Sequence, residues 1–236
     1  MKHVIDAGTD AASLLLFDPG ALPEDFDTAT DPDPVGLLER MQGAGRAYWI
    51  DTHADGAYVL HAYLDEPVPE SLATHTRNPV VVDSFQVPTG RLYFTGSEYA
   101  GAGVDGGLSR YPHMGGQLET RPGVYRLTVY ETEYPADLDE DVLRQQVSPG
   151  DFRVHQSMGF FVWLAILCAV GFAIALFGDI LKPWRYYLLP LFAAGIAWPF
   201  VLARLRPYRD THERYRAIQR EHPAYVVRLE WRGDLS

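Results

Sequence analysis

The stretch that decides the fold is MGFFVWLAILCAVGFAIALFG, residues 158–178. It belongs to an uncharged run of 23 residues, 156–178, with apolar side chains on every side. At about 1.5 Å rise per residue, a helix of this length spans the roughly 30 Å hydrocarbon core of a bilayer. A helix of a soluble protein would normally keep a polar face. The run therefore predicts a transmembrane helix over 156–178.

A second uncharged run of 18 residues, 186–203, follows after the short segment 179–185. Two such runs so close together predict a transmembrane hairpin. Its connecting loop carries two basic residues, Lys182 and Arg185. The flanks on the opposite side carry seven, namely Arg144, Arg153, Arg204, Arg206, Arg209, Arg214 and Arg216. Because basic flanks stay inside, both termini are expected in the cytoplasm and the loop outside. The Arg-rich, Lys-poor composition suggests a bacterial inner (plasma) membrane.

Side chains near the two runs suggest how the hairpin would sit and pack. Aromatic rings and arginines favour the headgroup zone, and the expected interface residues are Trp163, Trp184, Tyr186, Tyr187, Arg204, Arg206 and Arg209. Small residues four positions apart share one helix face and allow close backbone approach. The expected membrane-packing residues are Ala165, Ala169, Ala173, Ala193 and Ala197. Packing within the hairpin is the favoured use, with homo-oligomerisation left open.

Residues 1–155 read as a β-rich cytoplasmic domain. Runs of β-branched and aromatic residues recur between turn signals, a pattern typical of an antiparallel sandwich or barrel. The Asp55-Gly56 pair inside RAYWIDTHADGAYVLHAYLDE predicts a β-hairpin, and PTG inside NPVVVDSFQVPTGRLYFTG predicts a second. Together with the membrane helices this gives an α+β chain.

Helices are expected at only a few places outside the membrane runs. DPVGLLERMQ offers Asp33 as a cap and Pro34 at the first helical position, and DLDEDVLRQQV is a second candidate. Segment 204–236 reads as a basic helix followed by a strand, YVVRLEW. The Arg-rich helix, with Tyr208, Tyr215, Ile218 and His222 on one face, suits the anionic inner leaflet. Because a lone strand is unstable, the terminal strand is expected to join the sheet of residues 1–155.

Charge and cysteine content restrict the partners. Residues 1–156 hold 10 basic and 25 acidic side chains, a net charge of −15, which argues against nucleic acid. The single cysteine, Cys168, lies in the first apolar run, so no disulfide or cysteine-based metal site forms within one chain. The expected partners are the lipid bilayer, a protein at the cytoplasmic membrane face, and further copies of the chain.

Motifs for chemistry are weak. Gly101, Gly103 and Gly106 match the dinucleotide fingerprint, but GGLSRYPHMGG follows where that fingerprint needs a helix. The acidic segment EDFDTATDPDP lacks the glycine and glutamate that a calcium loop of the EF-hand type requires. No metal and no cofactor is therefore expected. Polar residues of the glycine-rich loop are the candidate ligand-binding residues, namely Glu98, Asp105, Arg110 and His113.

The sequence favours a non-enzymatic, membrane-anchored binding or regulatory module whose ligand it does not identify. A membrane-tethered, hydrolase-like enzyme built from dispersed carboxylates and histidines is the first alternative, and no catalytic residue is assigned to it. An oligomeric two-helix channel or transport accessory protein ranks last, because neither apolar run contains an ionisable side chain that would mark a polar pathway.

Overall fold

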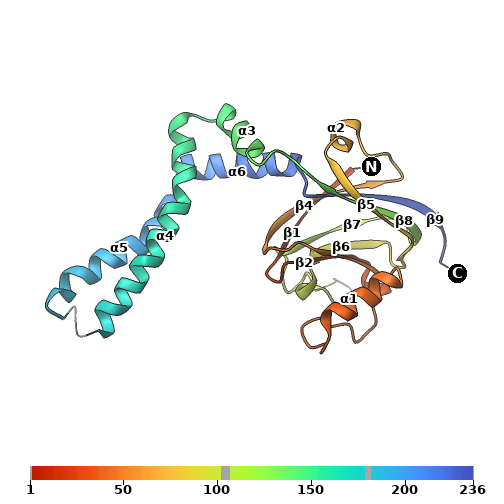
Figure 1. The fold of residues 1–236 in the computed structure, drawn as a ribbon, viewed down its shortest axis with the longest axis horizontal. Coiled ribbons are helices and arrows are strands. Elements are labelled where there is room, and N and C mark those ends of the chain that lie inside the picture. The colour runs from red at the N-terminus through yellow and green to blue at the C-terminus, as the bar shows by residue number, and fades with distance from the viewer. Residues whose placement is uncertain (1, 102–106, 179–181, 236) are drawn as a thin grey trace. The chain divides into compact units, whose positions relative to one another are not determined.

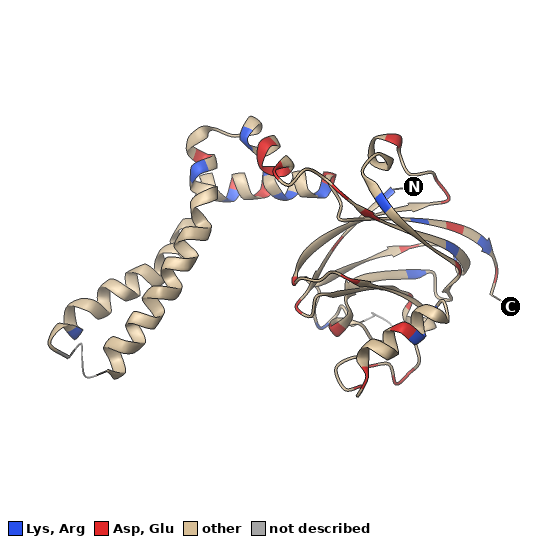
Figure 2. Cartoon of the chain, in the orientation of Figure 1, with Lys and Arg blue, Asp and Glu red and all other residues tan. Residues whose placement is uncertain are grey.

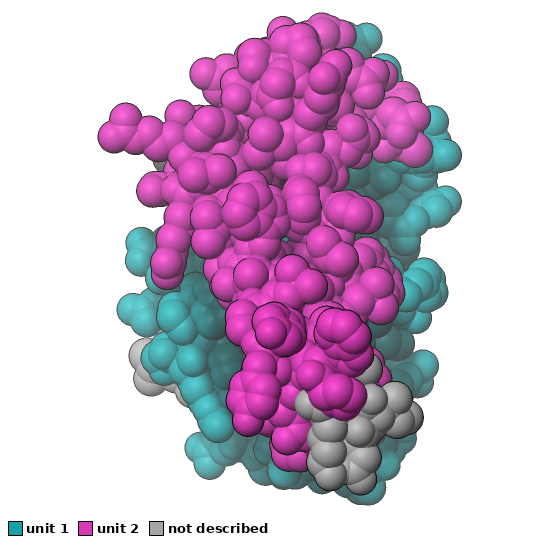
Figure 3. Space-filling model, turned by 90° about the vertical axis from the view of Figure 1, so that its left-hand side faces the viewer, with its two compact units in different colours: residues 1–134, 222–236 teal, residues 135–221 magenta. Residues whose placement is uncertain are grey.

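The computed structural model describes residues 2–101, 107–178 and 182–235. Contacts divide the chain into two compact units. One comprises Met1–Tyr134 with His222–Ser236, and the other comprises Pro135–Glu221 (Figure 3). The first unit holds the strands and the second holds the long helices (Figure 1). The fold is mixed α+β, which confirms the predicted class.

The first unit contains two sheets in its described residues. The strands are β1 (Lys2–Thr9), β2 (Ser13–Phe17), β3 (Ala47–Asp51), β4 (Gly56–Leu64), β5 (Thr76–Val87), β6 (Arg91–Gly96), β7 (Gly115–Glu119), β8 (Gly123–Thr132) and β9 (Tyr225–Gly233). One sheet has the order β1-β4-β9-β8-β5 and the other β3-β2-β6-β7. The described ladders are antiparallel except for β4 with β9, which run parallel. The C-terminal strand thus occupies the middle of a sheet whose other strands all lie before residue 135.

The two sheets enclose one apolar core to which all nine strands contribute. Leu14 of β2, Phe94 of β6, Leu127 of β8 and Leu229 of β9 are fully buried there. Backbone hydrogen bonds join the sheets at both margins. Gly8 N donates to Met114 O (3.0 Å) beside β1 and β7, and Gln86 N donates to Gly45 O (2.8 Å) beside β5 and β3. The sandwich is therefore partly closed, in the manner of a barrel.

The continuous apolar stretch LLLF at residues 14–17 of β2 is explained by burial on both faces of its sheet. Leu14 and Leu16 point into the core between the sheets. Leu15 and Phe17 point the other way, into a second cluster with Leu38 of helix α1 (Pro34–Gly43). Successive side chains of a strand alternate between faces, so a strand covered on both sides has no polar positions.

Both predicted hairpins are wrong. β3 pairs with β2 and β4 pairs with β1 and β9, so the chain crosses from one sheet to the other at Asp55-Gly56. β5 pairs with β8 while β6 pairs with β2 and β7, so the PTG turn is also a crossing between sheets. Gly90 has φ of +75°, and a Cβ there would lie 2.6 Å from Thr120 O. Both segments do turn, but a tight turn does not require its flanking strands to pair.

Short helices follow their sequence signals. Asp33 caps α1, its Oδ1 accepting from Gly36 N at 3.1 Å, and Pro34 stands at the first position as predicted. The predicted helix at DLDEDVLRQQV is α3 (Leu138–Gln146). The single-turn α2 (Glu70–Ala73) and the 3₁₀ turns Pro19–Ala21, Ser97–Tyr99 and Lys182–Trp184 complete the shorter elements.

In the second unit, α4 (Pro149–Phe177) and α5 (Arg185–Arg204) form an antiparallel hairpin (Figure 1). Both helices are long and apolar enough to cross a membrane. The packed seam includes the Phe161–Trp198 edge contact, with ring centroids 6.3 Å apart, and the close approach of Gly195 to Cys168. At the loop end, Arg185 Nε donates to Ala175 O at 2.8 Å, which satisfies a carbonyl in the last turn of α4.

The chain turns at Leu205 into α6 (Arg206–Glu221), which packs on α3 and the start of α4. Ile218 is 3% exposed and lies in a cluster with Leu143 and Phe152. Tyr215 packs against the same cluster. The apolar face that was expected to suit the lipid leaflet therefore contacts protein. The predicted segment 204–236 is divided, with α6 in the helical unit and β9 in the sheet unit.

Candidate functional site

The loop residues expected to bind a ligand have separate contacts in the described structure. Glu98 accepts hydrogen bonds from Thr9 Oγ1 (3.1 Å) and Asp10 N (2.6 Å), so its carboxylate fixes the turn after β1. Arg110 and His113 are exposed, and Arg110 lies 5.4 Å from the ring centre of Tyr111. Asp105 lies outside the described residues.

Tyr99, in the same loop, has a structural role too. Its hydroxyl donates to Asp10 Oδ2. The pKa of Tyr99 is raised to about 12, mainly by this hydrogen bond. Its ring centre lies 4.7 Å from that of Tyr111. A tyrosine held neutral in this way does not supply a base at physiological pH.

The alanines expected to pack are mostly exposed. Ala165 is half-buried. The remaining four are exposed, namely Ala169, Ala173, Ala193 and Ala197. The seam instead uses Gly171, where a Cβ would lie 2.7 Å from the ring of Phe192, and Gly195, where it would lie 2.4 Å from Cys168 Sγ. Glycines thus provide the close backbone approach that was assigned to alanines.

The residues expected at a membrane interface expose most of their side chains or lie at helix ends. The four aromatic residues are 63–85% exposed, namely Trp163, Trp184, Tyr186 and Tyr187. Arg204 ends α5 and Arg209 lies exposed on α6. Arg206, at the start of α6, also lines a pocket.

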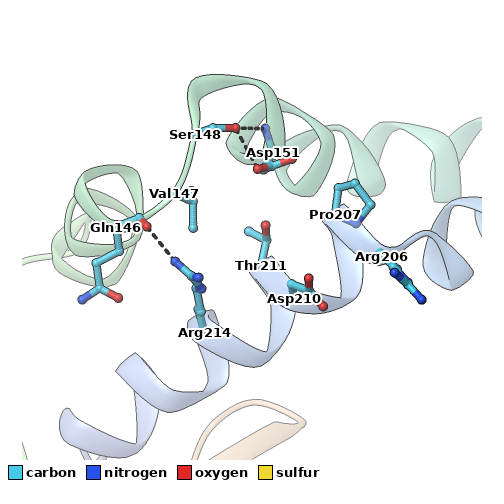
Figure 4. A pocket seen from close by; sticks show the side chains of 9 residues that line it. All are labelled: Gln146, Val147, Ser148, Asp151, Arg206, Pro207, Asp210, Thr211 and Arg214. Atoms are coloured by element: carbon cyan, nitrogen blue, oxygen red, sulfur yellow. Dashed lines mark hydrogen bonds between the residues drawn. The ribbon is translucent and has the colours of Figure 1, made fainter.

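That pocket lies within the helical unit, between the α3–α4 junction and α6, with a volume of about 370 Å³ (Figure 4). The α3–α4 junction contributes Gln146, Val147, Ser148 and Asp151, and α6 contributes Arg206, Pro207, Asp210, Thr211 and Arg214. Positions 206, 210 and 214 are one helical turn apart, so one face of α6 presents the charge order plus, minus, plus. Arg206 and Arg214 lie at opposite ends of the pocket in Figure 4.

Hydrogen bonds fix the wall opposite α6. Ser148 caps α4, its Oγ accepting from Asp151 N at 3.2 Å and donating to Asp151 Oδ2 at 2.7 Å. Arg214 Nη1 donates to Gln146 O at 2.8 Å and so joins α6 to the end of α3. These bonds hold Asp151 and Arg214 in place at the edge of the pocket.

Thr211 is the most buried polar group of this pocket. It is 2% exposed, and its hydroxyl points toward the Ser148–Asp151 side in Figure 4. Among the residues that the structure describes, this hydroxyl has no hydrogen-bond partner. Its oxygen is not one of the fully buried polar atoms without a partner, so water in the open pocket can satisfy it.

A cluster of histidine and tyrosine rings lies beside the pocket on α4 and α6. The His155 ring centre is 5.9 Å from that of His212 and 5.2 Å from that of Tyr215, and Tyr208 stacks on His212 at 5.6 Å. Burial, together with the charge of Arg216, lowers the pKa of His212 despite the opposing charge of Glu213. His212 is thus favoured in its neutral form.

Among the pocket residues, the sequence pointed only to Arg206 and Arg214, and it did so because they are basic flanks of the membrane helices. The usable signal was the spacing of Arg206, Asp210 and Arg214, which puts them on one face of a helix. The other wall, from Ser148 and Asp151, is more than 50 residues away in the chain, so only the fold brings it near. Within the described residues, no group of three or more His, Cys, Asp or Glu side chains could hold a metal ion.

Comparison with solved structures finds a chain described as "Crocagin biosynthetic gene J", with 17% sequence identity and a TM-score of 0.40, covering 60% of this chain and 82% of that chain. No family model and no curated protein matches the sequence.

Proposed function

We propose that the chain is a membrane-anchored, non-enzymatic binding module. The hairpin of α4 and α5 would be the anchor, and the β-sheet unit with α3 and α6 would lie at the cytoplasmic face of a bacterial inner membrane. The bilayer is one partner in this proposal, and a protein at the membrane face is the other.

The observation that carries the proposal is the exposure of apolar side chains around both long helices. In their most apolar 18-residue windows, only 6% and 11% of the residues are buried within the chain. Phe160, Leu167, Leu191 and Phe200 are 64–68% exposed. Water would oppose so large an apolar surface, whereas lipid or a partner chain would cover it favourably.

Charge supports the same arrangement. Lys, Arg, Asp and Glu lie on α3, on the first turns of α4 and along α6. The rest of α4 and almost all of α5 carry none of them (Figure 2). Membrane helices keep charges at their ends in this way, since a charge at the bilayer centre costs about 3 kcal/mol.

The proposal is tested by extraction and labelling. We expect the full chain, expressed in a bacterial host, to stay in the membrane pellet at alkaline pH. In a Cys168→Ala background, Pro183→Cys in the loop should react with a membrane-impermeant maleimide in intact spheroplasts. Asp33→Cys in the sheet unit should react only after lysis. Release of the wild-type chain by carbonate would contradict the anchor, and the reverse labelling pattern would contradict the orientation.

The binding role needs its own experiment. Crosslinking of the full chain in native membranes, followed by purification in mild detergent, should recover a stoichiometric protein partner. Recovery of a defined homo-oligomer alone would instead favour self-assembly, which the exposed Ala169 and Ala173 would permit.

A further inference from the structure

We infer that one side of α6, the arginine ridge formed by Arg209, Arg216 and Arg220, binds the phosphate groups of anionic phospholipids at the cytoplasmic surface of the membrane. The ligand would be a headgroup with net negative charge, such as that of phosphatidylglycerol. The inference rests on the proposed function, because the hairpin anchor is what places α6 beside a bilayer.

The arginine ridge follows from the spacing of basic residues along α6. Seven residues make about two helical turns and four make about one, so positions 209, 216 and 220 share one side of the helix. All three side chains are exposed. Arg209 and Arg216 have no ion pair with any residue that the structure describes, so their charges are available to a ligand. Glu213 borders the ridge and leaves its net charge positive.

Contacts of α6 with its neighbours show the direction in which the ridge faces. On one flank of α6, Arg214 donates to Gln146 O at 2.8 Å, just before α4 begins. On the other flank, the ring centre of His212 lies 5.9 Å from that of His155, which directly precedes the uncharged run 156–178. Passing around α6 from Arg214 to His212 therefore means moving along α4 toward its apolar part.

The arginine ridge comes next in the same direction. Arg209 and Arg216 lie one turn before and one turn after His212, further around the helix from Arg214. They therefore face the part of α4 that is proposed to enter the bilayer, at the level where headgroups begin. The exposed Asp210 lies on the Arg214 flank, so this acidic group points away from the leaflet.

The chemistry of the ridge suits phosphate. A guanidinium group offers two parallel N–H donors to two phosphate oxygens. Each basic residue near an anionic leaflet favours binding about fivefold. Phosphatidylcholine adds an ammonium group that the ridge would repel, whereas phosphatidylglycerol has none. Because the apolar face of α6 is buried against α3 and α4, the contact with the leaflet is electrostatic and needs no insertion of the helix.

Native mass spectrometry of the full chain tests this inference. The chain is released from nanodiscs that contain equal amounts of phosphatidylglycerol and phosphatidylcholine with the same acyl chains. We expect the retained lipid to be enriched about tenfold in phosphatidylglycerol. The double variant Arg209→Gln/Arg216→Gln should reduce this enrichment to about twofold.

Two controls separate the ridge from the net charge of the chain. Arg91→Gln/Arg110→Gln removes the same charge from exposed positions of the sheet unit and should keep the wild-type enrichment. Asp210→Asn, on the other flank of α6, should also keep it. The far-ultraviolet circular dichroism of the double ridge variant should match that of the wild type, which excludes unfolding as the cause of its loss.

Equal retention of both lipids by the wild type, or an unchanged enrichment in the double ridge variant, would overturn the inference. The ridge would then be left to an acidic segment of a partner protein. Carbonate extraction keeps the two proposals apart. The double ridge variant should stay in the membrane pellet, because α4 and α5 are unchanged, whereas release of the wild type would contradict the anchor itself.

Discussion

Asp18 shows how a single buried carboxylate organises the sheet unit. It is fully buried, and it accepts from Gly20 N at 2.9 Å, Thr89 N at 2.9 Å and Thr89 Oγ1 at 2.8 Å. Asp18 thus ties the end of β2 to the turn between β5 and β6. A buried carboxylate is tolerated only when donors surround it in this way.

We predict that Asp18→Ala lowers the free energy of unfolding by about 3 kcal/mol, because it removes the acceptor of these three donors and of Arg91 N. The measurement is chemical denaturation of the full chain in detergent, followed by near-ultraviolet circular dichroism. Asp25→Asn, at an exposed acidic position, serves as the control and should change little. Similar stability in the two variants would refute the role of Asp18.

For single residues, the sequence predicts a role better when the hydrogen-bond partner is near in the chain than when it is far away. Asp33 was predicted as a cap because its partner, Gly36 N, is three residues away. Glu98 was expected to bind a ligand, yet its carboxylate accepts from Thr9 and Asp10, nearly ninety residues earlier. Nothing in a linear motif indicates such a partner.

Among the elements, the hairpin seam depends on its glycines. Gly171→Leu would place a side chain where the ring of Phe192 lies, since even a Cβ would be 2.7 Å from it. We expect a loss of about 1–3 kcal/mol from overpacking, seen as a lower melting temperature of the helices in detergent. Ala173→Leu, on an exposed face of the same helix, should leave the melting temperature unchanged. A large effect of Ala173→Leu alone would instead indicate packing between copies of the chain.

The contact of α4 with α6 is expected to weaken in acid. Burial lowers the pKa of His212 below 6.5, so the unfolded state binds more protons than the folded state between that lowered pKa and 6.5. The stability that His212 contributes is therefore complete above about pH 6.5 and is lost as the pH falls toward the folded-state pKa. Hydrogen exchange of α6 amides, corrected for intrinsic rates, should show faster opening at pH 5.5 than at pH 7.5.

His212→Phe provides the comparison for that experiment, because it keeps a ring beside Tyr208 and His155 but does not titrate. The variant should show a smaller dependence on pH than the wild type. An identical dependence would assign the effect to other groups.

Element types were more predictable than their pairing. Apolar periodicity and capping residues indicated α1, α3, the long helices and most strands. Pairing failed at Asp55-Gly56 and at PTG, because the same turn residues serve a hairpin and a crossing between two sheets. Which of these forms is decided by the apolar faces that meet in the core, and those belong to strands far apart in the sequence.

At the scale of the whole molecule, the position of β9 decides whether the sheet unit can fold. It pairs with β4 on one side and β8 on the other, and Val226, Val227 and Leu229 are fully buried. A chain ending at residue 221 would split this sheet into the pairs β1-β4 and β8-β5, leave one edge of β4 and one of β8 unpaired, and remove part of the core. We predict that its sheet unit fails to fold, as judged by rapid proteolysis and the loss of near-ultraviolet circular dichroism.

A chain ending at Gly233 is the control for that truncation. It keeps all of β9 and loses the exposed Arg121–Asp234 ion pair, which contributes little. It should resist protease like the full chain. A folded sheet unit in the shorter chain would show that β9 is dispensable.

The site was the least predictable part of the molecule. The alternation of YVVRLEW indicated a strand that needed partners, but its neighbours could not be read from it. The pocket likewise required α6 to turn back onto the start of α4, which depends on the burial of Ile218 against Leu143 and Phe152. Local sequence patterns do not indicate long-range packing of this kind.

The central place of β9 also has a consequence for biogenesis. In the proposed membrane arrangement, the ribosome makes β1–β8 first, then both membrane helices, and β9 last. Should only one helix cross the bilayer, β9 would emerge on the opposite side from its partner strands. The sheet unit would then stay incomplete and open to proteases. In that arrangement, only chains with a correctly inserted hairpin could complete the sheet unit.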